Sequence, residues 1–373
     1  MRFELRQVCS RLSSGKGIPA DQVSDYGEYP VYGGNGLRGY TDHSNFEGEC
    51  AIIGRQGAFC GNVRFFSGKA YMTEHAIVVC ANEHHSTHYL SYLLSTMNLG
   101  RLSGQSAQPG LSVKTLAKQE IELPTLKEQN KIVSILASFD DKIALNTKIN
   151  NNLEQQAQAL YKAWFIDFEP FGCSTPPEWQ QSTLAQIAII RTDSWSPTKS
   201  SDVEVEYYSI PAFDEQHYPM FETASAIKSN KYILSPDSVM ISKLNPETKR
   251  IWRPMCLSSR PVCSTEFIVY EAKKNGHRDY IYSIIDSIPF FHYLCSHTTG
   301  STNSRQRATP KATLEYPILL PPDSVIEDFC GIVTPMYDLI ASNIIENQSL
   351  AKTRDSLLPK LMSGELDVSG IDL

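Results

Sequence analysis

Residues 132–164 read IVSILASFDDKIALNTKINNNLEQQAQALYKAW, and this stretch decides the fold. Its apolar side chains recur in alternating steps of four and three residues, and two of the repeat positions hold asparagine. That spacing is the a/d seam of a coiled coil. A helix over 126–166 would be about 60 Å long at 1.5 Å per residue. The seam positions are Ile132, Leu136, Phe139, Ile143, Asn146, Asn150, Leu153, Ala157, Leu160 and Trp164.

A second helix with the same seam follows 197 residues later, since Ile121-Glu-Leu-Pro124 matches Ile318-Leu-Leu-Pro321 and Asp141 matches Asp338 without a gap. Such self-similarity indicates an internal repeat. Pro335 is expected near the start of this helix or at a kink, and Pro359 should disturb its last turns. The seam continues through Phe329, Val333, Met336, Ile340, Asn343, Asn347, Leu350, Arg354, Leu357 and Leu361.

The asparagines predict how the two helices pair. Antiparallel packing about a midpoint near residue 148 places Asn146 opposite Asn347 and Asn150 opposite Asn343. Parallel packing would also match asparagines, but a long domain would then have to return along the whole helix. Buried polar residues at single seam positions fix register at some cost in stability. The alternative is that these asparagines face solvent.

A weaker repeat precedes each helix. Ala51-Ile-Ile-Gly-Arg55 resembles Val239-Met-Ile-Ser-Lys243, and Thr73-Glu74 before an apolar run resembles Thr265-Glu266. Short β-branched runs bounded by Gly, Pro and Asn predict a mainly β core, with helices near 88–98 and 279–294. We therefore expect an α+β fold with two similar, mainly β domains, separated by two long antiparallel helices in a coiled coil with pseudo-two-fold symmetry.

Composition and charge narrow the class of protein. Of 373 residues, 41% are hydrophobic and 20% charged, as in soluble globular domains. The nine cysteines include no CxxC pair, and no apolar signal or membrane stretch is evident, so we expect reduced thiols and a cytoplasmic location. The net charge of −7 lies almost wholly in residues 321–373, which leaves both candidate domains near neutral. Neutral domains predict modest electrostatic affinity for DNA unless a partner adds to it.

Several short segments, together with the repeat, resemble the specificity subunit of type I restriction-modification enzymes over essentially the whole chain. They are Ile53-Gly-Arg-Gln-Gly57 with Gly61-Asn-Val63, Thr73-Glu-His75, Gly104-Gln-Ser106 through Leu111-Ser112, Leu123-Pro124 with Glu128-Gln129, and Leu357-Leu-Pro-Lys-Leu-Met-Ser-Gly364. The second copy departs from the pattern, with Ser242 in place of Gly54 and Val325-Ile326 in place of Glu128-Gln129.

This resemblance implies a non-catalytic DNA-binding subunit of a restriction system that defends against foreign DNA. Each globular domain would be a target-recognition domain for one half of a bipartite target, and the helices would set the spacer. The implied ranges are 1–124 and 169–320 for the domains, 125–168 and 321–363 for the spacer helices, and 364–373 for a tail. The implied partners are double-stranded DNA, two methyltransferase subunits and the motor-nuclease subunit. S-adenosylmethionine, ATP and Mg²⁺ would be bound only by those partner subunits.

Candidate DNA contacts are Arg, Lys, Asn and Gln side chains on loops that can enter a groove. Solvated surface residues are the plain alternative for any one of them. In the first domain the candidates are Asn35, Arg38, Arg55, Gln56, Asn62, Arg64, Arg101, Gln105 and Gln108. In the second, the loops matched to these are 199–201, 243–253 and 298–307, with Lys199, Lys243, Asn245, Lys249, Arg250, Arg253, Asn303, Arg305, Gln306 and Arg307.

Three other patterns are interpreted as decoys. Gly34-Asn-Gly36-Leu-Arg-Gly39 matches GxGxxG, but the loop-like sequence after it argues against a dinucleotide site. Cys80, His84, His85 and His88 are more consistent with a helix start than with zinc. Asp140-Asp141 lies within the coiled-coil helix, where partner contact or solvation is preferred over nuclease chemistry.

Two other functions compete with the specificity subunit. A stand-alone methyltransferase or nuclease is disfavoured, because neither an Asn-Pro-Pro-aromatic motif nor a Walker A lysine loop is present in the sequence. A coiled-coil adaptor without DNA contact would explain the helices, but not two different repeat-related domains that carry polar loops.

Overall fold

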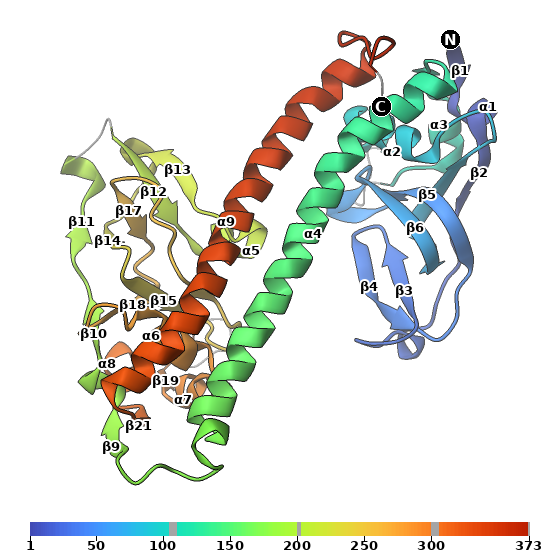
Figure 1. The fold of residues 1–373 in the computed structure, drawn as a ribbon. Helices are drawn as coiled ribbons and strands as arrows, with labels where there is room; N and C mark the ends of the chain where they lie inside the picture. The colour runs from blue at the N-terminus through green and yellow to red at the C-terminus, as the bar shows by residue number, and fades with distance from the viewer. Residues whose placement is uncertain (104–109, 200–202, 300–305, 372–373) are drawn as a thin grey trace. The chain divides into compact units, whose positions relative to one another are not determined.

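The structure is a computed structural model that describes residues 1–103, 110–199, 203–299 and 306–371 (Figure 1). The chain divides into two compact units. The first unit holds Met1–Ile143 and Gln348–Leu373, and the second holds Ala144–Asn347. Each long helix contributes to both units. The units are therefore described one at a time.

The long helices are α4 (Leu126–Phe165) and α9 (Asp323–Met362), each 40 residues long. Their first residues are 197 positions apart, which confirms the repeat. Thr125 and Glu128 form a capping box at the start of α4, in which the Glu128 carboxylate accepts from the Thr125 amide at 2.8 Å. Pro335 lies inside α9, not near its start, and the helix continues past Pro359. The expected disturbance of the last turns is therefore wrong, because buried Leu361 keeps them packed in the core.

The predicted seam is confirmed within each unit. Every seam position is buried or half-buried, while neighbouring positions such as Leu145 and Leu339 are exposed. In the second unit, Asn146 Nδ2 donates to Asn347 Oδ1 at 2.9 Å, and Asn343 Nδ2 donates to Asn150 Oδ1 at 2.8 Å. Residue numbers rise along one helix as they fall along the other, so the pairing is antiparallel, as the sequence predicts.

The seam of the first unit is short and ends in an ion pair. Ile132 and Leu136 of α4 share a core cluster with Leu361 of α9. Asp140 pairs with Arg354, which occupies a seam position of α9. The tail adds to this end, because buried Val368 joins the same cluster and Lys131 Nζ donates to the Ser369 carbonyl oxygen at 2.8 Å.

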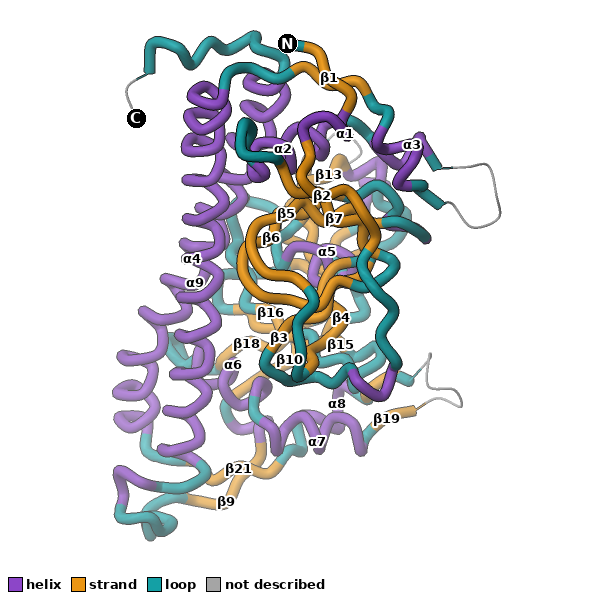
Figure 2. Tube along the Cα trace, turned by 90° about the vertical axis from the view of Figure 1, so that its right-hand side faces the viewer, coloured by secondary structure: helices purple, strands orange, loops and turns teal. Residues whose placement is uncertain are grey.

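The first unit is built on a curved sheet with strand order β2-β7-β5-β6-β3-β4 (Figure 2). Its core is formed by inward residues of β5 and β7, against which α2 packs. A separate pair joins β1 to β8 beside the start of α4. The elements are β1 (Arg2–Glu4), α1 (Leu5–Val8), β2 (Cys9–Ser14), β3 (Tyr29–Gly33), β4 (Gly36–Thr41), β5 (Phe46–Gly54), β6 (Val63–Met72), β7 (Ala76–Ala81), α2 (Thr87–Thr96), α3 (Val113–Ala117) and β8 (Glu120–Glu122).

The second unit has two main sheets, with strand orders β10-β18-β15-β16 and β11-β14-β17-β12-β13. Its largest core cluster joins the first of these sheets to α6, α7 and the helices α4 and α9. The strands are β9 (Gln180–Thr183), β10 (Ala188–Arg191), β11 (Ser194–Trp195), β12 (Glu204–Tyr208), β13 (Met220–Thr223), β14 (Lys231–Ile233), β15 (Ser238–Ser242), β16 (Ile251–Trp252), β17 (Pro261–Cys263), β18 (Phe267–Ala272), β19 (Thr298–Thr299), β20 (Arg307–Ala308) and β21 (Pro317–Leu320).

The helices of the second unit's domain are α5 (Ile210–Gln216), α6 (Arg278–Asp286), α7 (Ile288–Ser296) and α8 (Pro310–Thr313). The single helix predicted over 279–294 is in fact two, α6 and α7. They are separated at Ser287, whose side chain caps α7 by accepting from the Phe290 amide. Pro289 has no amide hydrogen to continue α6, so the chain starts a new helix there.

Candidate nucleic-acid interface

The first candidate surface forms where β5 ends, and we call residues 55–62 the first strand-end loop. The Arg55 amide donates to the His75 carbonyl oxygen at 3.0 Å, and the Arg55 carbonyl oxygen accepts from the Leu111 amide at 2.8 Å. Gly57 has a φ of +78°, and its carbonyl oxygen accepts from Cys60 at 3.0 Å. These bonds fix the backbone of the loop while leaving Gln56 exposed.

The second unit builds the same loop after β15, and we call residues 243–250 the second strand-end loop. The Lys243 amide donates to the Glu266 carbonyl oxygen at 2.9 Å, and the Lys243 carbonyl oxygen accepts from Ala308 at 2.9 Å. Asn245 has a φ of +48°, and its carbonyl oxygen accepts from Thr248 at 2.9 Å. The predicted equivalence of Arg55 and Lys243 is therefore confirmed, and it extends to a left-handed turn two residues later.

The predicted alignment of the next segment is one residue out of register. The Thr73 amide donates to the Tyr32 carbonyl oxygen at 2.9 Å, and the Ser264 amide donates to that of Tyr208 at 2.9 Å. Thr73 therefore corresponds to Ser264, not to Thr265. The identical letters Thr-Glu in both copies favour the wrong match, since β7 and β18 present similar apolar runs in either register.

A hairpin turn completes the first surface. Gly34 lies so close to the strand end that a Cβ built on it would be 3.0 Å from the carbonyl oxygen of His75. A Cβ on Gly36 would be 3.1 Å from the guanidinium carbon of Arg64. The β3–β4 turn, which carries exposed Asn35 and Arg38, thus lies beside the first strand-end loop.

The second unit has a helix where the first has this turn. After Tyr208, the counterpart of Tyr32, Ser209 caps α5 by accepting from the Ala212 amide at 3.1 Å. The counterpart of the Gly33–Arg38 turn is therefore the start of α5. The match of that turn to residues 199–201 is wrong, because Lys199 precedes β12 and the turn follows the equivalent strand β3. The Ser-Ile-Pro sequence at 209–211 is the signal that would have predicted this helix start.

The candidate residues differ in how free their side chains are. Lys243 and Asn245 of the second strand-end loop are half-buried, as is Gln306 beside it, and Arg55 is half-buried with its guanidinium near the Glu74 carbonyl oxygen. Gln105, Gln108, Asn303 and Arg305 lie outside the described residues. The exposed candidates are Asn35, Arg38, Gln56, Asn62, Arg64, Arg101, Lys199, Lys249 and Arg307.

Three basic candidates of the second unit are held by carboxylates. Arg250 forms a two-pronged pair with Asp214 of α5 at 2.6 and 2.9 Å. Arg307 pairs with Glu266 at 3.0 and 3.2 Å. Lys249 pairs with Asp286 of α6 at 2.6 Å.

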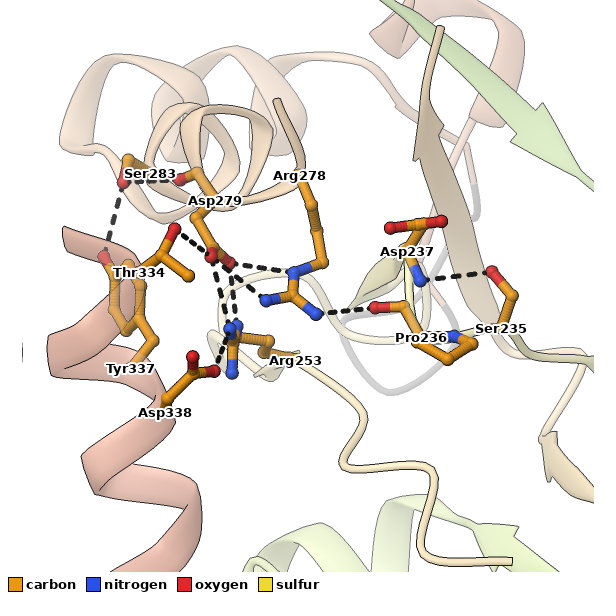
Figure 3. A network of polar contacts seen from close by, with 10 residues as sticks. All are labelled: Ser235, Pro236, Asp237, Arg253, Arg278, Asp279, Ser283, Thr334, Tyr337 and Asp338. Atoms are coloured by element: carbon orange, nitrogen blue, oxygen red, sulfur yellow. Dashed lines mark hydrogen bonds and ion pairs between the residues drawn. The ribbon is translucent and has the colours of Figure 1, made fainter. Parts of the chain in front are cut away.

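Arg253 lies in a buried polar network and not on a loop surface (Figure 3). Its guanidinium donates to Asp279 at 2.7 Å and to Asp338 of α9 at 2.6 Å. Burial raises the pKa of Asp279, but hydrogen bonds from Arg253 and Arg278 outweigh it and hold that pKa below its ordinary value. With its side chain only 10% exposed, Arg253 ties the domain to α9 and is not part of the loop surface.

The equivalent place in the first unit has different chemistry. His88 stacks on Phe65, with ring centroids 3.7 Å apart, and on Tyr92 at 4.9 Å. The Tyr92 hydroxyl donates to Asp140, which is also paired with Arg354. Of the two interpretations left open for Asp140, partner contact or solvation, the contact with Arg354 of α9 fits the first. Neither the aromatic stack nor the Asp279 network was predicted, because both depend on residues far apart in the sequence.

The remaining decoys have ordinary structural roles. Gly34 and Gly36 belong to a hairpin, and β4 follows instead of the helix that a dinucleotide site needs. His85 contacts Gln129 at 3.2 Å, and His84 lies 3.7 Å from Glu83. Within the described part of the chain, no helix has the length and apolar character needed to cross a bilayer.

The chain resembles known proteins in sequence and in fold. Residues 1–155 match the family described as type I restriction modification DNA specificity domain. The chain is 39% identical over 134 residues to the EcoprrI specificity subunit of Escherichia coli, a match that spans 35% of this chain and 33% of that subunit. It is 28% identical over 304 residues to the MjaIX specificity subunit of Methanocaldococcus jannaschii, covering 75% of this chain and 69% of the relative.

The fold agrees with these matches. The crystal structure of the type I restriction-modification S subunit from M. genitalium superimposes with a TM-score of 0.61 at 16% identity, covering 97% of this chain and 95% of that one. At that identity the likeness concerns the fold alone. The chain is thus similar in sequence to specificity subunits of type I restriction enzymes, and similar in fold to an S subunit.

Proposed function

We propose that this chain is the non-catalytic DNA-reading subunit of a type I restriction-modification complex. It reads a bipartite, asymmetric target in cytoplasmic double-stranded DNA and directs methylation and cleavage by partner subunits. The observation that carries this proposal is the strand-end loop, built twice on the same backbone hydrogen bonds. A reader present in two copies suits a target with two half-sites, because the spacing of half-sites mirrors the spacing of the readers.

The side chains on the two loops support an asymmetric target. The loops place a basic residue at the same point, Arg55 or Lys243, but Asn62 of the first corresponds to Arg250 of the second. Base edges in the major groove present different donors and acceptors, so different side chains on one backbone select different bases. The two half-sites should therefore be different words.

The long helices offer a surface for a methyltransferase subunit. In the second unit, Leu145 and Ile149 of α4 and Ile332 and Leu339 of α9 are exposed. Each immediately precedes a seam position, which places it about 100° from the seam. The domain packs on the other flank, through residues such as Tyr337 that immediately follow a seam position. An exposed apolar strip of this kind suits the helices of a partner protein.

The chemistry belongs to the partners under this proposal. S-adenosylmethionine would be bound by the methyltransferase subunits, and ATP and Mg²⁺ by the motor-nuclease subunit. This chain would position them on DNA and hold no cofactor of its own.

The experiment is to co-purify the chain with its methyltransferase subunit and to map methylation on a random duplex library. We expect one split word with unlike halves. Gln56→Ala should relax one half only, and Gln155→Ala, an exposed position on α4, is the control. Methylation of all duplexes alike would favour the adaptor without DNA contact, and methyl transfer by the chain alone would favour an enzyme.

The partner surface has its own test. Leu145→Glu with Ile149→Glu should abolish co-purification of the methyltransferase subunit, because charges cannot be buried in an apolar contact without a partner. Lys148→Glu, exposed on the same turn of α4, should leave it intact. Unchanged co-purification of the double variant would contradict this assignment of the surface.

A further inference from the structure

Two arginines at the second strand-end loop, Arg250 and Arg307, face carboxylates at close range. The backbone of Arg307 forms an isolated β-bridge with Leu244 of the loop, and the Arg307 guanidinium pairs with the Glu266 carboxylate. The carbonyl oxygen of Glu266 accepts from the Lys243 amide. Arg250 ends the loop, and its side chain, only 13% exposed, binds Asp214. Both pairs use Nε and Nη2 of the arginine, which is the strong, directional geometry for a carboxylate.

The first unit differs at each corresponding position. The shared hydrogen bonds place His75 where the second unit has Glu266, and Asn62 where it has Arg250. Gly110 forms an isolated β-bridge with Gln56 as Arg307 does with Leu244, so Gly110 occupies the position of Arg307. Neither of the carboxylate pairs of the second unit has a counterpart among the described residues of the first.

The first surface carries arginines that are not held by carboxylates in the described part of the chain. Arg38 and Arg64 are exposed. The Arg55 guanidinium donates to uncharged oxygens, the backbone carbonyl oxygen of Glu74 at 3.3 Å and the hydroxyl of Ser14 at 3.5 Å. In the described part of the chain these three arginines are not in ion pairs with acidic side chains. The sequence of residues 104–109, GQSAQP, contains no acidic residue either.

An arginine that is already bound to a carboxylate is a poor phosphate ligand. To bind a phosphate through Nε and Nη2 it must leave its partner, and the released carboxylate then faces the phosphates. An unpaired arginine neutralises a phosphate directly and releases a counterion, which steepens the salt dependence of binding by about 0.9 in log–log slope per contact.

We infer that Asp214 and Glu266 withhold Arg250 and Arg307 from phosphate, so that the first domain supplies most of the salt-dependent grip on DNA. The second domain reads its half-site with guanidinium groups that these carboxylates orient. In each, the carboxylate is bound through Nε and Nη2, and under this inference Nη1, outside that fork, is the donor to a base acceptor. This inference rests on the proposed function.

The test measures DNA affinity of the complex with its methyltransferase subunit on a duplex that carries the mapped target, across salt concentrations. Arg38→Gln and Arg64→Gln should each lower the slope by about 0.9, which is about a 3.5-fold smaller loss of affinity between ~50 and ~200 mM salt. Arg38→Lys keeps the charge and should restore the slope. Arg250→Gln and Arg307→Gln should leave the slope nearly unchanged and relax one half-site.

Removing the carboxylates instead of the arginines should steepen the salt dependence of binding. Asp214→Asn and Glu266→Gln should each raise the slope by up to about 0.9 and tighten binding at low salt. Glu327→Gln on α9 makes the same change in net charge and is the control, with no expected change in slope.

The inference is overturned if the two acidic variants behave like Glu327→Gln, or if the slope falls with the second domain's arginines instead of the first's. Circular dichroism and co-purification establish that each variant is folded. A wild-type complex without preference for the mapped target over competitor DNA would contradict the proposed function itself. A preference with the wrong slopes would contradict only this inference.

Discussion

The side-chain amide of Asn343 donates a hydrogen bond of 2.8 Å to Oδ1 of Asn150 inside the helix seam. Both residues are less than a tenth exposed, at 8% and 7%. An apolar seam tolerates sliding by a heptad, whereas a buried amide pair is satisfied in only one register. This contact therefore fixes the alignment of α4 and α9 within the second unit.

Replacing both asparagines should raise stability, and replacing one should not. Asn150→Leu alone strands the buried Asn343 amide, at a cost of about 1–3 kcal/mol. Asn150→Leu with Asn343→Leu restores an apolar seam and should unfold at higher urea than the wild type. Urea denaturation of the four proteins in a double-mutant cycle measures this. Additive single effects would mean that the two amides do not interact.

Loss of Asp279 should be among the most damaging single changes in the second unit. Its carboxylate, 2% exposed, binds Arg253, Arg278 and Thr334. Asp279→Ala leaves two mostly buried guanidinium groups with fewer partners, so the free energy of unfolding should fall by about 3–5 kcal/mol. Asp338→Asn is the control, because that carboxylate is 62% exposed and its pair should contribute less than about 1 kcal/mol. Equal losses from both changes would refute the buried network as the cause.

His88 should make the first unit less stable in mild acid. Burial between Phe65 and Tyr92 lowers the pKa of His88, although Glu49, Asp140 and Asp141 act to raise it. The unfolded chain therefore takes up the proton first, and the free energy of unfolding falls as pH drops below about 6.5. His88→Phe keeps the stack and removes the titration. Unfolding curves between about pH 5 and 8 should show the variant gaining on the wild type as pH falls, and a constant difference would argue against this role.

Lengthening both helices should change the length of DNA between the two half-sites but not the half-site sequences. Seven residues inserted near 148 and near 345 add about 10 Å of helix, or about three base pairs. If α4 and α9 set the spacing of the half-sites, methylation mapping should find the same half-words with a longer gap between them. Insertion into one helix only breaks the asparagine pairing and should abolish methylation. Altered half-words would contradict the division between helices and domains.

The helices could be predicted from the sequence because their signal is local and repeated. The alternating steps of four and three, the 197-residue offset and the position of four asparagines together give the elements, their antiparallel pairing and their register. Pro359 was misjudged because the packing of Leu361 and its neighbours outweighs the loss of one backbone hydrogen bond.

The candidate interface was only partly predictable. Arg55 and Lys243 stand after similar apolar strands, so their equivalence could be found from the sequence. The replacement of a hairpin by α5 and the pairing of Arg250 with Asp214 could not, since they depend on how distant segments meet. Charge counts treat Arg250 and Arg64 alike, whereas in the structure only Arg250 has a carboxylate at 2.6 Å.

Gly54 and Ser242 also bear on how such a chain can evolve. A side chain at position 54 would lie 2.6 Å from the carbonyl oxygen of Gly34 and displace the hairpin, whereas the Ser242 hydroxyl donates to the Leu244 carbonyl oxygen at 3.0 Å. Recombination that copied the second strand into the first would therefore disable one reader. Crossovers within the helices, in contrast, exchange positions that match in the two copies, because the helices repeat at an offset of 197 residues. New target specificities can thus arise by shuffling whole halves at the helices.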